Sequence, residues 1–365
     1  MEDFKIQEPS KNAVKTAYPR WNDEKGGIKV PNETKSYLNF GIVGCGMIAD
    51  IHAQALKSLA GVHLVGVADV SFAHAKSFAE KHGVFAYETY EKMLSDKTID
   101  AICICTPSGF HAEQAKAALL AGKHTAVEKP IAMTVSDADS VIETAEKSGK
   151  LLSVISQLRF SEDVVRLKNA VLNESFGKIH FCNLSMKYWR DESYYSGSRW
   201  KGSRLLDGGI LMNQGIHGID LLRHVIGNAT VISSVTDRLY HKIESPDTAL
   251  ALLRYDCGAL GVLEATTAAF PGFDLKLEII GEKGYAVFTE DHLTSFVIEG
   301  KEQPLASEAK SSGTASDPKA VGWKKHALQL RNFANAICGT AQLAVCGKDG
   351  REAVALIADV YKENM

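Results

Sequence analysis

The sequence lacks any long apolar run and any strong excess of one charge. No stretch of eighteen residues is wholly apolar, so we expect no transmembrane helix. Lysine and arginine number 41 against 44 aspartate and glutamate residues, and the net charge of −3 gives no general attraction to nucleic acid or to a membrane surface. The N-terminal stretch has no apolar segment typical of a secretory signal, and we therefore expect a cytoplasmic protein.

Metal-binding and disulfide patterns are also missing. The seven cysteines are odd in number and scattered, which is typical of core thiols in a reducing compartment. The twelve histidines form neither an H-x-x-x-H nor an H-E-x-x-H pattern. We therefore expect no metal site.

What the sequence does contain is a glycine-rich turn between an apolar strand and a helix. The run Gly41-Ile42-Val43-Gly44-Cys45-Gly46-Met47-Ile48-Ala49 matches the G-x-G-x-x-[GA] fingerprint of dinucleotide binding. Gly44 permits the tight turn, and Gly46 permits the close approach of a pyrophosphate. Met47 and Ile48 open a helix whose first N–H groups favour anions. The alternative is an α/β turn that binds no nucleotide.

A second apolar strand, Val62–Ala68, ends in Asp69. Its distance from the glycine turn is near the usual spacing for an acid that binds a ribose 2′-hydroxyl. Because no arginine follows at once, the pattern favours NAD over NADP.

The order of the predicted elements indicates an α/β protein with two domains, since 365 residues exceed one ordinary core. Strands and helices alternate up to about residue 157, which predicts a doubly wound parallel Rossmann sheet. Longer strands without intervening helices come next, and they predict a large, mostly antiparallel open sheet with one face covered by helices. We assign residues 37–157 to an NAD-binding domain, 158–365 to a substrate-binding and oligomerisation domain, and 1–36 to a polar extension.

The individual elements are predicted from apolar periodicity and turn signals. We expect strands at 39–43, 62–68, 101–105, 124–127, 151–155, 179–188, 230–241, 248–255, 260–267, 275–280 and 285–289. We expect helices at 111–121, 135–148, 162–172, 326–338 and 351–361, another that begins at Leu211, and a mobile loop at 301–322.

The triplet Glu128-Lys129-Pro130 directly follows the strand predicted at 124–127. Ligands of an open parallel sheet bind beyond the carboxyl ends of its strands. Lys129 is therefore expected beside the cofactor, where it can hydrogen-bond a substrate hydroxyl and stabilise a developing alkoxide. The alternative is a surface lysine before a turn proline.

A second polar motif runs from Leu206 to Asp220 and includes a pair of glycines. Asn213 and His217 are four residues apart and share a helix face. Asn213 can hold a substrate or orient a neighbour, and His217 can take a proton near neutral pH. The alternative is that His217 is a satisfied core residue.

Together these motifs resemble the glucose–fructose oxidoreductase / inositol dehydrogenase / MocA (Gfo/Idh/MocA) family. The glycine turn, Cys105-Thr106-Pro107, Glu128-Lys129-Pro130 and the G-G…N-x-G-x-H-x-x-D helix occur in the order and spacing of that family over about residues 38–365. The resemblance implies that the protein oxidises or reduces one carbinol of a sugar or cyclitol with NAD(P). It also implies a homodimer or homotetramer formed through the C-terminal sheet.

Carried over residue by residue, the resemblance implies that Lys129 is the lysine of the catalytic motif and that His217 is the acid/base histidine. Asn213 completes the predicted catalytic set. The predicted cofactor contacts, besides the glycine turn and Asp69, are Thr106, Pro107, His111, Glu128 and Lys129.

Asn213 departs from the inositol dehydrogenases, in which aspartate is often found four residues before the histidine. This difference counts against an inositol dehydrogenase. At this position the chain resembles instead the members that oxidise carbon 3 of UDP-N-acetylglucosaminuronic acid. The stretch Ser198-Arg199-Trp200-Lys201-Gly202 also resembles that branch.

The segment 187–204 is rich in basic and aromatic residues. Arginine forks suit carboxylates and phosphates, and aromatic faces suit sugar or uracil rings. The alternative is a solvated loop or a dimer contact. The predicted substrate-binding residues are Arg159, Arg190, Arg199, Trp200, Lys201 and Asn213.

The sequence thus predicts NAD-dependent oxidation of one secondary hydroxyl of a sugar, most directly carbon 3 of a UDP-N-acetyl sugar acid. An inositol or polyol dehydrogenase, or a sugar ketoreductase, is the alternative within the enzymes. A non-catalytic NAD-binding regulator is the alternative outside them.

Overall fold

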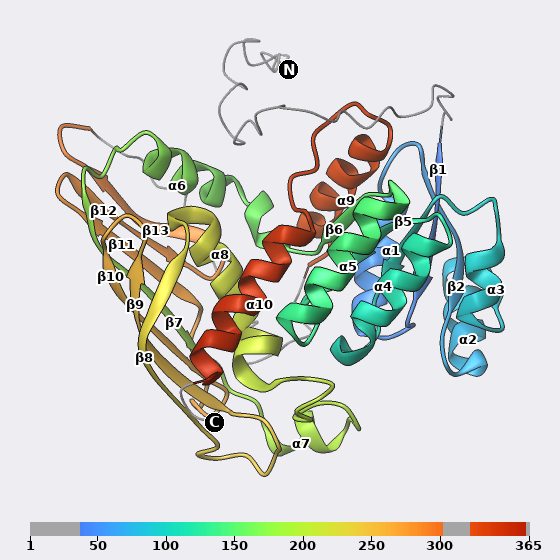
Figure 1. Cartoon of the computed structure of the whole chain (residues 1–365), viewed down its shortest axis with the longest axis horizontal. Helices are drawn as coiled ribbons and strands as arrows, with labels where there is room; N and C mark the ends of the chain where they lie inside the picture. Colours follow the sequence, from blue (N-terminus) through green and yellow to red (C-terminus); the bar gives the residue numbers. More distant parts are fainter. Residues whose placement is uncertain (1–36, 302–321, 363–365) are drawn as a thin grey trace, which may run out of the picture.

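The computed structural model of this chain describes residues 37–301 and 322–362. Two β-sheets lie side by side with helices between them and around the first sheet (Figure 1). The expected extension at 1–36 and nearly all of the expected loop at 301–322 lie outside the described residues. No helix in the described part of the chain combines the length and the apolar character needed to cross a membrane.

The first sheet is parallel throughout and has the strand order β3-β2-β1-β4-β5-β6. This is the doubly wound order that places ligands at the carboxyl ends of the strands. Its strands are β1 (Leu38–Val43), β2 (Val62–Ala68), β3 (Phe85–Tyr87), β4 (Ala101–Ile104), β5 (His124–Val127) and β6 (Leu152–Val154). Its helices are α1 (Met47–Lys57), α2 (Phe72–His82), α3 (Tyr90–Ser95), α4 (His111–Leu120) and α5 (Val135–Ser148).

The second sheet has the order β13-β12-β11-β7-β10-β9-β8, in which only the β7–β10 pair is parallel. Helices α6 (Glu162–Leu172) and α8 (Ile216–Ile226) cover the face that looks toward the first sheet, and the short helix α7 (Glu192–Ser196) lies below (Figure 1). The strands are β7 (Ile179–Lys187), β8 (Ala229–Asp237), β9 (Thr248–Tyr255), β10 (Leu260–Thr266), β11 (Lys276–Gly281), β12 (Gly284–Thr289) and β13 (His292–Ile298).

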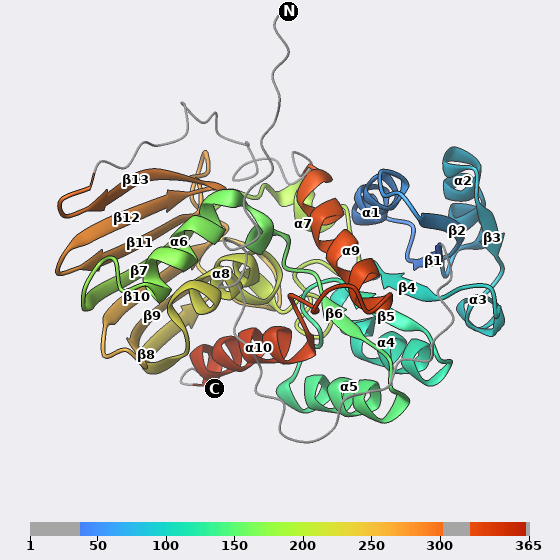
Figure 2. The same cartoon turned by 90° about the horizontal axis from the view of Figure 1, so that it is seen from above.

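The last two helices bind the two sheets together. Helix α9 (Lys324–Ile337) packs on α1 beside the parallel sheet, where Phe333 meets Phe40 edge to face with ring centroids 6.2 Å apart. Helix α10 (Gly347–Lys362) lies between the sheets and contacts α5, α8 and β8 (Figure 2). The carboxyl ends of the parallel strands are therefore held at a fixed position relative to α8.

The outer face of the second sheet carries exposed apolar residues among polar ones. Along β9 buried and exposed residues alternate, as expected for a strand with one face on the core. The exposed positions include Leu250 and Leu252, which are 49% and 50% exposed, and Val262 of β10 pairs with Leu252. No described helix lies over this face (Figures 1 and 2).

The fold class and most of the predicted elements are confirmed. The predicted elements did not include β3, α2, α3 and α7, and three other differences have a local cause. Strand β8 ends at Asp237 instead of residue 241, because the Asp247 carboxylate accepts the N–H groups of Leu239, Tyr240 and His241 and turns the chain. Strand β13 was not predicted. It comes after a turn in which Glu290 has a φ of 60°, and this turn contains no glycine or asparagine to signal it. The helix expected from Leu211 begins as a π-helical turn, Leu211–Gly215, before α8.

Candidate active site

The glycine turn brings the ends of β1 and β4 into contact. Gly44 has a φ of 86°, and a Cβ atom at this residue would lie 2.8 Å from the carbonyl group of Cys105. The Gly44 N–H donates to the carbonyl oxygen of Ala68 over 2.8 Å. Only glycine fits this turn without displacing the backbone of β4.

Gly46 is different, because a Cβ atom at this residue would meet no protein atom within 4 Å. It is the N-cap of α1, and no side chain caps the helix there. The N–H groups that open α1, including those of Met47 and Ile48, have no helical partner. An open backbone with unshared donors at a helix N-terminus fits the pyrophosphate of a dinucleotide.

Asp69 lies directly beside this turn. One carboxylate oxygen accepts the N–H of Cys45 over 2.8 Å, and the other accepts the N–H of Ser71 over 2.8 Å. The carboxylate therefore shapes the glycine turn, and its remaining lone pairs can accept from ribose hydroxyls. These contacts fit the role that the sequence predicts for Asp69.

His111 is buried at the start of α4, and its contacts are with the protein backbone. Its ring nitrogens lie 2.7 Å from the carbonyl oxygen of Pro130 and 2.8 Å from that of Thr106, and burial lowers its pKa. The Thr106 hydroxyl in turn donates to Gln114 over 2.6 Å. His111 thus links the loop that holds Thr106 and Pro107 to the loop after β5, and it orients both predicted cofactor loops.

Glu128 is buried at the end of β5, and its carboxylate accepts from His52 Nε2 of α1 over 2.7 Å. Burial alone would raise the pKa of Glu128, but the hydrogen bond and charge of His52 lower it to about 2. His326 Nε2 of α9 lies 4.0 Å from Glu128 Oε1. The sequence predicts no metal site, yet within the described ranges these three residues form one group whose candidate ligand atoms lie within 4.8 Å of one another. Its geometry is that of a buried ion pair with a second histidine at its edge.

Lys129 reaches from the end of β5 to the π-helical turn before α8. Its ammonium Nζ donates to the backbone oxygen of Asn213 over 2.9 Å and lies 3.4 Å from the Asn213 side-chain oxygen. Burial lowers the pKa of Lys129, while the carboxylates of Glu128 and Asp207 act in the opposite direction. Single π turns inside helices are frequent at functional sites.

His217 and Lys129 line the same small cavity, together with Ile131, Val154, Ile155, Ser156, Ile216, Asp220, Gly350 and Ala353. Burial and the positive charge of Lys129 lower the pKa of His217 to about 3. The imidazole is therefore neutral at neutral pH and has a ring-nitrogen lone pair that can accept a hydrogen bond.

Asp207 contacts Asn213 and was not among the predicted site residues. It accepts from the Asn213 side-chain amide and from the Gly202 N–H, the latter over 2.9 Å. Gly208 and Gly209 come next with φ values of 73° and 80°, so the chain turns sharply between Asp207 and the π turn. The one sequence signal for Asp207 was its position directly before the glycine pair.

The basic and aromatic segment packs around Tyr194. Lys201 Nζ lies 3.6 Å from the centre of the Tyr194 ring, and the buried Arg190 guanidinium lies 5.5 Å from it. The Tyr194 hydroxyl accepts from Gln214 of the π turn over 3.1 Å. The segment therefore contacts the π-helical turn directly.

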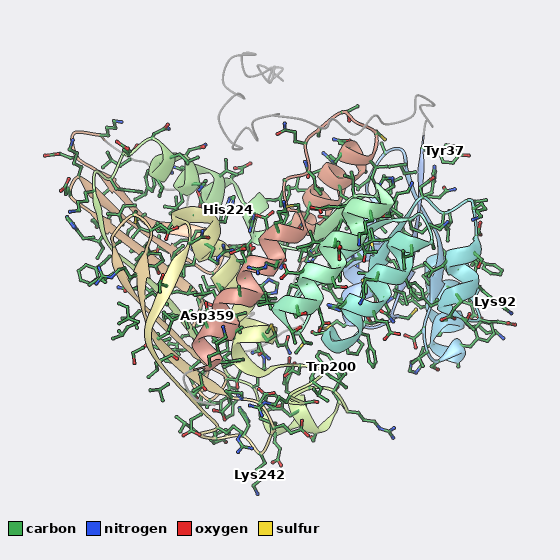
Figure 3. All side chains as sticks on the ribbon, viewed as in Figure 1. Tyr37, Lys92, Trp200, His224, Lys242 and Asp359 are labelled. Atoms are coloured by element: carbon green, nitrogen blue, oxygen red, sulfur yellow. The ribbon has the colours of Figure 1, made fainter. Side chains whose placement is uncertain are left out.

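The other predicted substrate residues divide into two groups. Arg199 is exposed and Trp200 is half-buried. Figure 3 labels Trp200 in the lower half of the molecule, above Lys242. Arg159 is buried elsewhere: its guanidinium donates to Asp220 over 2.8 and 2.6 Å and to Asp349 over 2.9 Å. The sequence places Arg159 in the substrate cleft, whereas its observed contacts hold η2 (Gln157–Phe160) to α8 and α10.

Two family models match this chain. A model described as an oxidoreductase family with an NAD-binding Rossmann fold matches residues 38–156. The GFO/IDH/MocA C-terminal domain matches residues 164–287. Both matches agree with the two sheets described above.

Named relatives cover most of the chain. The myo-inositol 2-dehydrogenase of Thermotoga maritima is 30% identical over 277 residues, which are 73% of this chain and 79% of that protein. The WlbA dehydrogenase of Bordetella pertussis, solved with NADH and UDP-GlcNAcA, has a TM-score of 0.82 and 26% identity over 91% of this chain and 96% of its own. The WlbA dehydrogenase of Chromobacterium violaceum, solved with the same two ligands, also has a TM-score of 0.82, with 29% identity over 92% of this chain and 96% of its own.

The glycine turn yields the first prediction, which concerns Gly46→Val. The branched side chain would occupy the open space at the helix N-terminus, so NAD affinity should fall at least tenfold, the equivalent of about 1.4 kcal/mol. Calorimetric titration with NAD measures this fall, and circular dichroism should show an unchanged fold. Gly44→Ala serves as the contrast, because its Cβ would collide with β4 and should lower the melting temperature. Normal NAD affinity in Gly46→Val would place the pyrophosphate elsewhere.

Proposed function

This chain belongs to the Gfo/Idh/MocA oxidoreductase family, and we propose that it oxidises one secondary hydroxyl of a sugar with NAD⁺. The proposed substrate is a UDP-N-acetyl sugar acid, and the proposed position is carbon 3. The observation that carries the proposal is the pairing of the Lys129 ammonium with the π turn that leads to His217. The segment around Tyr194, with its basic residues, adjoins that turn.

The proposed chemistry divides between the two side chains. His217, neutral because it is buried beside Lys129, accepts the proton of the substrate hydroxyl. The Lys129 ammonium donates a hydrogen bond to the same oxygen and stabilises the negative charge that develops there. NAD⁺, when bound along the glycine turn, supplies the acceptor for the hydride. Asn213 holds Lys129 in place through its backbone and side-chain oxygens.

The charge of the substrate is inferred from the segment 187–204. Phosphates and a sugar carboxylate need cationic partners, and Arg199 and Lys201 stand next to the aromatic Trp200 and Tyr194. Two neighbours of similar fold were solved with UDP-GlcNAcA, which supports the same substrate class for this chain.

A cyclitol is the second candidate substrate, because the Thermotoga maritima relative is a myo-inositol 2-dehydrogenase. Asn213 counts against it, since the inositol dehydrogenases that the sequence resembles often have aspartate there. A sugar ketoreductase would use the same residues in the opposite direction. A non-catalytic NAD-binding regulator would have no need to keep both Lys129 and His217.

Two further features of the protein belong to the proposal. All seven cysteines are free thiols, which supports a reducing compartment such as the cytoplasm. The exposed apolar residues on the outer face of the second sheet support a homodimer or homotetramer that buries them.

The direct test is the formation of NADH by the purified protein with NAD⁺ and a panel of substrates. We expect UDP-N-acetylglucosaminuronic acid to be oxidised and myo-inositol to be oxidised poorly. Efficient oxidation of myo-inositol without any oxidation of UDP-sugar acids would overturn the substrate assignment. Tight NAD binding with no oxidation of any sugar would favour the regulator.

Substitution of the two proposed catalytic side chains should abolish most turnover. Lys129→Ala and His217→Ala should each lower kcat by about 10²–10⁴-fold, the usual cost of removing a general acid or base. NAD affinity, measured by calorimetry, should stay within a few-fold of normal. His224→Gln is the matched control: this residue is on the same helix and burial also lowers its pKa to about 3, but it lies away from Trp200 (Figure 3). A His217→Ala enzyme that turns over like the control would make His217 a packing residue.

Arg199 provides a test of substrate charge. Loss of one hydrogen bond to a charged group costs about 1.5–3 kcal/mol, so Arg199→Ala should raise the KM for UDP-N-acetylglucosaminuronic acid about ten- to a hundredfold. Added salt should weaken wild-type substrate binding through screening. Arg254→Ala, which removes an exposed arginine from the outer face of the second sheet, is the control. Equal KM values in the two variants would show that Arg199 does not bind the substrate.

The outer sheet face yields a prediction about assembly. Leu252→Glu combined with Val262→Lys places a cross-strand ion pair on that face, which preserves the β9–β10 pairing while removing apolar area. We expect light scattering after size exclusion to show a smaller assembly than for the wild type. Leu120→Glu, at an exposed position of α4, should leave the mass unchanged. A variant of wild-type mass would show that copies associate through another surface.

A further inference from the structure

One buried carboxylate lies between the predicted substrate segment and the catalytic lysine. Asp207 is 1% exposed. One of its oxygens accepts from the side-chain amide of Asn213, and the other accepts from the backbone N–H of Gly202 over 2.9 Å. A buried carboxylate with well-placed donors on both oxygens is held in a single orientation.

The contact with Asn213 decides which way that amide faces. A side-chain amide can rotate by half a turn and exchange its oxygen and nitrogen, but a carboxylate only accepts hydrogen bonds. Asp207 therefore selects the rotamer in which the Asn213 nitrogen faces the carboxylate. The amide oxygen is then left on the side of Lys129, 3.4 Å from Nζ, next to the backbone oxygen that accepts from Nζ over 2.9 Å.

The hydrogen bond from the Gly202 N–H fixes the other oxygen of the Asp207 carboxylate. Gly202 has a φ of 77°, and a Cβ atom there would lie 2.6 Å from a methyl group of Ile243, so this position is tightly confined. It comes directly after Arg199, Trp200 and Lys201. One carboxylate thus anchors the end of the predicted substrate segment and the partner of Lys129 at the same time.

We propose that Asp207 is a positioning residue: through the Asn213 amide it aligns the Lys129 ammonium, and through Gly202 it aligns the substrate segment. This role rests on the proposed function, because it serves the oxidation that Lys129 and His217 carry out. Asp207 supplies a negative charge one side chain away from Lys129, whose direct partner, Asn213, is uncharged.

The ionisation of Asp207 gives the role a pH signature. Burial raises the pKa of Asp207 to about 6, against hydrogen bonds from Gly202, Asn213 and Gly209 that favour the carboxylate. Below about pH 6 the carboxyl is protonated and the charge that supports Lys129 is lost, so wild-type kcat should fall on the acid side. Among the described residues, the charge of Asp207 raises the pKa values of Lys129, Tyr194, Tyr195 and Tyr361.

The test compares Asp207→Asn with the exchange variant Asp207→Asn/Asn213→Asp. An asparagine at 207 offers one acceptor oxygen instead of two, so Asp207→Asn should lower kcat on the order of ten- to a hundredfold. It should also remove the fall below about pH 6 and leave NAD affinity unchanged. The exchange variant returns a carboxylate to the pair beside Lys129 and should recover most of kcat. Asp163→Asn, which alters a carboxylate of α6 that accepts the Leu293 N–H of β13, is the control.

A measurement without substrate separates this proposal from the proposed function. Nuclear magnetic resonance of protein labelled with ¹³C-lysine follows the titration of Lys129, whose signal is identified by its loss in Lys129→Arg. The midpoint should fall in Asp207→Asn, because the carboxylate that favours the charged ammonium is gone. An unchanged midpoint, or an exchange variant that folds but is no better than Asp207→Asn, would overturn the role of Asp207. A failure to oxidise any UDP-sugar would instead overturn the substrate assignment and leave the midpoint shift intact.

Discussion

The hydrogen bond from Lys129 Nζ to the backbone oxygen of Asn213 is the contact on which the site depends. It joins the end of β5 in the parallel sheet to the π turn that precedes α8 on the second sheet. An ammonium in this partly buried place needs fixed acceptors, because desolvation penalises its charge. The π turn directs the backbone oxygen of Asn213 toward Lys129, and His217 lies on the next turn. The relative position of the two sheets therefore decides whether Lys129 and Asn213 meet.

A buried charge cluster at α8 and α10 helps to hold that relative position, and a second cluster fixes the end of β5 within the first domain. Glu128 pairs with His52 beside α9, and Arg159 pairs with Asp220 and Asp349 between α8 and α10. Breaking a buried pair by removing one partner typically costs about 3–5 kcal/mol, because the other charge stays behind without compensation. Both clusters draw residues from elements far apart in the chain. They hold the frame in which Lys129 and Asn213 meet.

Local sequence patterns indicated where those parts of the candidate site lie that belong to one turn or one strand end. The glycine turn and the Glu128-Lys129-Pro130 triplet each lie at the carboxyl end of a strand, so the strand pattern alone indicated their surroundings. The pairing of Glu128 with His52 spans 76 residues, and no periodicity reports such a contact. Arg159 looked like a substrate ligand because its two carboxylate partners come from helices that pack on it only in the folded chain. The role of Asp207 likewise depends on a sharp turn at two glycines that brings its carboxylate back onto Asn213.

We propose that hydride leaves carbon 3 of an anionic sugar held beside Lys129 and His217. The most direct measurement is a reaction of the wild-type protein with NAD⁺ and UDP-N-acetylglucosaminuronic acid deuterated at carbon 3, followed by mass spectrometry of the NADH. The account predicts NADH that contains deuterium and a slower hydride-transfer step than with the unlabelled sugar. NADH without deuterium, or no NADH at all, would contradict it.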